Sequence, residues 1–162
     1  MPIFDLAIIE TGNGGDLQQV GSDLAVVNGI ENMIYLGMFG GNKEASTQSN
    51  IITDGDFWGN NLFHPNAPSV QFNSETERVM NSVALTSSGR VLIENAIKKD
   101  LAFFSDLGAT VEVSVTIVST DKIRVQIKVT LPSQAPNITI INFRKALDGD
   151  YFILDFNDDF FI

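Results

Sequence analysis

Two neighbouring segments alternate apolar and polar residues, and this pattern limits the possible folds more than any other feature of the chain. The first, residues 110–118, reads TVEVSVTIV, and the second, residues 122–131, reads KIRVQIKVTL. Alternating side chains point to opposite faces of a strand, and the short Ser119-Thr120-Asp121 connection predicts an antiparallel hairpin. One face is expected to pack on helices and the other to be wet. The charged residues of the wet face are Glu112, Lys122, Arg124 and Lys128.

The chain continues this sheet towards its C-terminus. Residues 137–144, NITIINFR, predict a third strand, and Asp148-Gly149 predicts a turn before a last strand over residues 151–156. The final segment stays aromatic and acidic to its last residue, although chain ends are normally polar. It is expected either to close the sheet as an edge strand or to dock into a neighbouring subunit by strand addition. The candidate partner-interface residues here are Tyr151, Phe152, Phe156, Phe160, Phe161 and Ile162.

Two helices are expected before the hairpin. A capping-box pattern, Ser74 with Glu77, begins a helix that is expected to end near Leu85. A longer helix is expected over residues 87–107, and Gly108 fits a left-handed C-cap. An apolar stripe and an ion pair at i,i+4 spacing indicate that the longer helix is amphipathic. The stripe is Ile93, Ile97, Leu101 and Phe104, and the pair is Glu94 with Lys98.

Short strands and one helix are expected at the N-terminus. Residues 3–10, IFDLAIIE, predict one strand, and residues 16–27 predict two short strand pieces separated by a turn. Residues 30–39 have helical spacing, with Asn28 as a candidate N-cap. No internal repeat is found. The predicted fold class is α+β: N-terminal short strands, a helix, a long loop, two helices and a C-terminal antiparallel β meander packed on the helices. Residues 1–147 are expected to form the domain, and residues 148–162 an acidic aromatic C-terminal strand or docking tail.

A long polar loop is expected over residues 41–70, and it contains the single tryptophan in the stretch Gly55-Asp56-Phe57-Trp58-Gly59-Asn60. Glycines on both sides of a large ring allow the backbone to turn tightly around it. Phe57 and Trp58 therefore read as a plug at the end of the helix–sheet core, as an aromatic anchor against a partner, or as a sugar platform.

Composition argues against several classes of function. The 162-residue chain has a formal charge of −10, so a nucleic-acid or anionic membrane partner is not expected. It has no cysteine and a single histidine, His64, which argues against thiol chemistry and against zinc sites built on several histidines. The N-terminal glycine cluster does not open a helix, so a phosphate cradle is not expected. No enzyme activity, cofactor or metal is therefore predicted.

The N-terminal half carries a set of short motifs that resembles the Mu-type phage baseplate protein family. The motifs are Asp5, Gly15-Asp16-Leu17, Asp23-Leu24, Gly29-Ile30-Glu31-Asn32 and Phe57-Trp58-Gly59, and the resemblance covers most of residues 3–131. That family is distantly similar to the wedge protein of contractile phage tails that is described as "lysozyme-like". The Glu-Pro-Arg tripeptide of the better-known wedge relatives is absent, and the segment after about residue 145 has no match in the family.

The resemblance implies a structural role in a virion. Such proteins join the core of the baseplate wedge and support the start of the contractile sheath, and they are assembled in the cytoplasm of the bacterial host. The expected partners are other wedge proteins and the first sheath ring, with about six copies in a symmetric particle. Two alternatives remain open: a tail-associated cell-wall hydrolase, or a small ligand- or carbohydrate-binding module.

Overall fold

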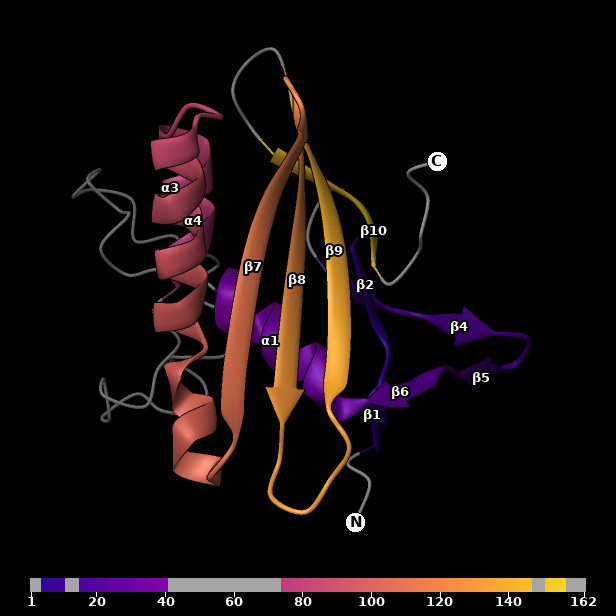
Figure 1. Cartoon of the computed structure of the whole chain (residues 1–162). Coiled ribbons are helices and arrows are strands. Elements are labelled where there is room, and N and C mark those ends of the chain that lie inside the picture. Colours follow the sequence, from indigo (N-terminus) through magenta and orange to yellow (C-terminus); the bar gives the residue numbers. More distant parts are fainter. Residues whose placement is uncertain (1–3, 11–14, 41–73, 147–150, 157–162) are drawn as a thin grey trace, which may run out of the picture.

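The computed structural model describes residues 4–10, 15–40, 74–146 and 151–156, and it has the α+β architecture that the sequence predicts. Among these residues, three helices and a 3₁₀ helix lie beside a four-stranded antiparallel sheet. A group of very short strands lies at the N-terminal end of helix α1 (Gly29–Phe39), to one side of the sheet (Figure 1). The predicted loop of residues 41–70, with Phe57, Trp58 and His64, lies outside the described residues.

The C-terminal meander is the largest sheet, with strand order β10-β9-β8-β7. Its strands are β7 (Thr110–Ser119), β8 (Lys122–Thr130), β9 (Asn137–Lys145) and β10 (Tyr151–Phe156). The hairpin prediction is confirmed, because Val113 lies opposite Ile127 and Glu112 opposite Lys128. Strand β10 pairs antiparallel with β9 and so forms an edge strand of this sheet, one of the two arrangements that the sequence leaves open.

The helices cover one face of this sheet. They are α1 (Gly29–Phe39), α3 (Thr76–Ser82) and α4 (Ser87–Asp100), and the last is followed by the 3₁₀ helix η3 (Ala102–Leu107). Burying their apolar side chains against the alternating strands supplies most of the stabilisation, at roughly 25 cal/mol per Å² of apolar surface. The fully buried core residues include Ile34, Met38, Ile93, Ile97, Leu101, Phe104, Ile123, Val125, Ile127, Val129 and Ile141.

The long helix predicted over residues 87–107 is in fact two helices. Thr86 is the N-cap of α4 and accepts a hydrogen bond from the backbone N–H of Gly89 (3.1 Å). Beyond Asp100 the backbone tightens into η3, in which residues three apart lie one above the other. Leu101 and Phe104 are therefore both fully buried. Gly108 has φ = 70° and ends η3, as predicted.

The N-terminal strands differ most from the prediction. The run of residues 3–10 divides at Ala7 into β1 (Phe4–Leu6) and β2 (Ile8–Glu10). Each half pairs with a different strand, β1 with β6 (Val26–Asn28) and β2 with β3 (Gly15–Leu17). A third strand pair, β4 (Gln19–Val20) with β5 (Asp23–Leu24), forms a hairpin that extends away from the rest of the molecule (Figure 1).

The three strand pairs meet in a ring of backbone hydrogen bonds, which we call the junction. Ala7 donates to Ala25 (2.8 Å), Ala25 donates to Gln18 (2.9 Å), and Gln18 donates to Ala7 (2.9 Å). Each of these three residues follows an Asp-Leu pair in the sequence: Asp5-Leu6, Asp16-Leu17 and Asp23-Leu24. The expectation of no internal repeat is therefore wrong at this scale, because a three-residue unit repeats around the junction. The unit is too short and too irregularly spaced to stand out in the sequence.

Candidate interaction surfaces

The side chains predicted to contact a partner lie outside the part of the chain that the structure describes. Phe57, Trp58, Phe160, Phe161 and Ile162 lie outside the described residues. Tyr151, Phe152 and Phe156 belong to β10, where only the backbone pairing and the side chain of Ile153 are described. Ile153 is half-buried and packs against the core. These predicted contacts therefore stay predictions.

One face of the junction exposes large apolar side chains, and we call it the leucine face. Leu6, Leu17 and Leu24 occupy equivalent positions in the three strand pairs, one residue before each junction residue, so the cyclic arrangement of the ring turns all three to the same side. Their side chains are 38%, 45% and 43% exposed. Val26 lies directly opposite Leu6 on the neighbouring strand and is 60% exposed. A contiguous exposed apolar patch of this kind is typical of a protein–protein interface.

The junction is hydrogen-bonded to helix α1. Ala7 points away from the leucine face and is buried, and the side-chain amide of Asn32 in α1 donates to the carbonyl oxygen of Leu6 (2.5 Å). Asp5 and Asp23 each accept a hydrogen bond from the N–H of the leucine that follows. The hydrogen bond from Asn32 therefore ties the strand that carries Leu6 to α1.

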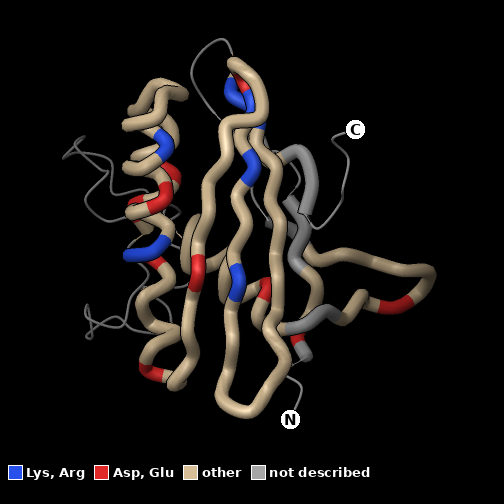
Figure 2. The backbone as a smooth tube through the Cα atoms, viewed as in Figure 1, with Lys and Arg blue, Asp and Glu red and all other residues tan. Residues whose placement is uncertain are grey.

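The second surface is the face of the four-stranded sheet opposite the core, which we call the open face. It is exposed along β7 and at both ends of β9, whereas Asn142 on the same face is fully buried and accepts a hydrogen bond from Arg124 (3.2 Å). No helix among the described residues covers it (Figure 1). Figure 2 shows that Lys and Arg recur along its central strands. Lys128 pairs with Glu112 across the β7–β8 ladder (2.8 Å), and Arg144 pairs with Asp121 (2.9 Å). Ile138, opposite Lys128 in the register, is 51% exposed.

Helix α4 protects the outer edge of β7 from pairing with another strand. Arg90 donates to the carbonyl oxygen of Val115 (3.2 Å), and the carboxylate of Glu94 accepts a hydrogen bond from the backbone of the same residue. Side chains thus take the place of a neighbouring strand, which is one way in which proteins avoid edge-to-edge aggregation. The hydrogen bond from Lys98, above all, lowers the pKa of Glu94 below its ordinary value.

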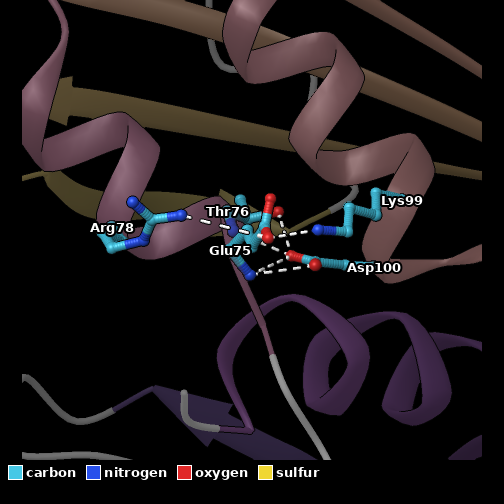
Figure 3. A network of polar contacts seen from close by, with 5 residues as sticks. All are labelled: Glu75, Thr76, Arg78, Lys99 and Asp100. Carbon is cyan, nitrogen blue, oxygen red and sulfur yellow. Dashed lines mark hydrogen bonds and ion pairs between the residues drawn. The ribbon is translucent and has the colours of Figure 1, made fainter. Parts of the chain in front are cut away.

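The densest polar network in the described residues surrounds Asp100, at the end of α4 (Figure 3). Its carboxylate accepts the backbone N–H of Glu75 (2.9 Å to each oxygen) and both the N–H and the hydroxyl of Thr76 (2.8 and 2.6 Å). Glu75 in turn pairs with Lys99 and, at 4.0 Å, with Arg78. Burial raises the pKa of Asp100, and its hydrogen bonds oppose that shift.

This network acts as a tertiary N-cap. The first N–H groups of a helix have no partner within the helix and favour an anion nearby. The predicted capping box placed Ser74 at the cap, but the N-cap position of α3 is Glu75, whose own side chain makes no capping hydrogen bond. Asp100, about 25 positions away in the chain, supplies the acceptor instead. Carboxyl groups with a shifted pKa often mark catalytic sites, but the capping role fully accounts for the burial and the contacts of Asp100.

Two further kinds of site concern metal ions and membranes. No group of three or more metal-ligating side chains occurs within the part of the chain that the structure describes. In that same part, none of the helices has the length and apolar character needed to cross a bilayer.

Comparisons with known proteins found no match: no family model, no curated protein and no solved structure is detectably similar to this chain. The leucine face was missed in the sequence because isolated Asp-Leu pairs read as ordinary strand residues. The charges did indicate that the N-terminal region differs from the rest of the chain. No lysine or arginine occurs before Lys43, although five acidic residues precede it.

Proposed function

We propose that this chain is a non-enzymatic structural component of the baseplate of a contractile tail, in a phage or a related injection particle. It acts through protein–protein contacts, joins the core of the baseplate wedge and supports the start of the sheath. The proposal rests first on the motif resemblance, which concerns the N-terminal half of the chain.

The observation that carries the proposal is the leucine face. The same motif residues on which the resemblance depends, Asp5, Gly15-Asp16-Leu17 and Asp23-Leu24, belong to β1, β3 and β5, one strand of each pair in the junction. Their structural result is a set of apolar side chains turned to solvent, next to a hydrogen bond that joins the junction to α1. An enzyme has no general need for such a surface, whereas an assembly protein needs a preformed, largely apolar contact.

The open face and the protected edge of β7 fit the same role. A protein that waits in solution before assembly must avoid unintended strand pairing, and Arg90 with Glu94 satisfies the backbone of Val115. The high net negative charge keeps such a component soluble until its partners are present.

Gene disruption in a producing strain tests the proposal. We expect electron microscopy of the lysate to reveal no contractile tails when the chain is absent, and complementation with the unaltered chain to restore them. Complementation with a Leu17→Ser, Leu24→Ser variant is expected to fail, whereas Leu92→Ser, which alters an equally exposed leucine of α4, is expected to succeed. Normal tails in the disrupted strain would refute the proposed role.

A further inference from the structure

The charges of this chain are segregated between its two exposed surfaces. Residues 1–42, which contain the junction and α1, have five acidic residues and no lysine or arginine. Residues 110–146, which contain β7, β8 and β9, have five basic residues against two acidic ones. Figure 2 shows this separation, with Lys and Arg on the strands of the sheet and Asp on the projecting hairpin. A chain with a net charge of −10 therefore has one surface region of the opposite sign.

We propose that the leucine face of one copy binds the open face of a second copy, so that the chain associates head to tail. The leucine face supplies Leu6, Leu17, Leu24 and Val26, and the open face supplies Ile138 with Lys128, which lies opposite it in the register. Apolar contact gives the affinity, and the attraction between an acidic and a basic unit sets the orientation and speeds the encounter. This inference deepens the proposed function and rests on it only for the place of the contact in a particle.

The alternative self-contacts are less favourable. Two junctions face to face would bring together two units of five acidic residues each, which repel one another at moderate salt. Within one chain the junction strands lie to one side of the sheet and not over its open face (Figure 1). Contact between two different surfaces therefore has to involve a second molecule.

Such a heterologous contact has a definite structural consequence. When two copies have bound, one still has an unused leucine face and the other an unused open face, so the contact repeats until a ring closes. The ion pairs of the open face, Lys128 with Glu112 and Arg144 with Asp121, are at the surface and individually weak. They can therefore exchange partners when the acidic unit of a neighbour approaches.

Sedimentation velocity of the full chain tests the proposal with two variants and one control. The junction variant is Leu17→Ser with Leu24→Ser, and the sheet variant is Lys128→Glu with Ile138→Ser. The control, Leu92→Ser, removes a leucine of α4 that is 52% exposed and belongs to neither surface. Circular dichroism of each variant establishes that the fold is intact.

We expect the unaltered chain and the control to associate with rising concentration, and each of the two variants alone to be a monomer. A 1:1 mixture of the variants is expected to form dimers and nothing larger, because one retains a working open face and the other a working leucine face. Association is expected to weaken as salt is raised. An unaltered chain that remains monomeric at about 1 mM would overturn the proposal.

Two further results would also overturn it. If the sheet variant alone still dimerises, the contact joins two leucine faces. If the mixture of variants stays monomeric while the unaltered chain associates, the two surfaces do not bind one another. Either result leaves the baseplate role untouched, because that role is tested by the presence of tails in the disrupted strain.

Discussion

Replacing Asp100 by alanine should destabilise the protein more than any other surface carboxylate substitution in the described residues. The carboxylate accepts three donor groups: the backbone N–H groups of Glu75 and Thr76 and the hydroxyl of Thr76. Loss of an N-cap typically costs about 1 kcal/mol. Each hydrogen bond to a charged group contributes about 1.5–3 kcal/mol, although water replaces part of this at a half-exposed position. We therefore expect the free energy of unfolding to fall by about 3 kcal/mol.

Urea denaturation followed by circular dichroism measures this loss. With an m-value of about 2 kcal/mol per molar urea, the midpoint should fall by about 1.5 M at unchanged slope. Asp106→Ala is the matched control, because Asp106 is an exposed aspartate of the neighbouring η3. It should change stability by less than about 0.5 kcal/mol. Equal midpoints for the two variants would show that Asp100 does not cap α3 and would refute the reasoning.

Three further predictions concern α4. Glu94→Gln should lower the free energy of unfolding by about 0.5–1 kcal/mol at neutral pH. Because the pKa of Glu94 is lowered in the folded state, the stability that its charge contributes is present above the ordinary pKa of 4.5 and is lost as the pH falls through the lowered pKa. Urea titrations of the two proteins should therefore converge in acid. Gly89→Ala should lower the free energy of unfolding by about 2 kcal/mol, which a fall in the melting temperature would reveal. The added Cβ would lie 2.0 Å from the carbonyl oxygen of Ala84, and this clash outweighs the better helix propensity of alanine. Combined Arg90→Ala and Glu94→Ala should expose the edge of β7 and speed aggregation in light scattering, and an equal rate for Asn95→Ala would contradict the protective role.

The meander and the longer helix could be predicted because their periodicity is strong and local. Val113 and Ile127 alternate with polar neighbours over a whole strand, and Ile93 and Ile97 repeat at helical spacing. Such residues leave only one face to bury, so the tertiary structure follows the local pattern. The end of α4 was predicted seven residues too late, because the apolar stripe continues unchanged through the change from α to 3₁₀ geometry at Asp100.

The junction and the cap of α3 could not be predicted, because both depend on contacts between distant residues. Ala7 ends β1 only because its N–H and carbonyl group reach Ala25 and Gln18. Asp100 reads as one more charge on a helix until α3 is placed beside it. The leucine face depends on the junction in turn, since only the threefold arrangement brings Leu6, Leu17 and Leu24 to one side.

The most direct test of the central claim is quantitative mass spectrometry of purified particles from a producing culture, with this chain counted against the tail-tube protein. The account predicts a low, fixed number of copies, about six per particle, as expected for a symmetric baseplate ring. A chain that is absent from the particles and remains free in the lysate would contradict the baseplate role.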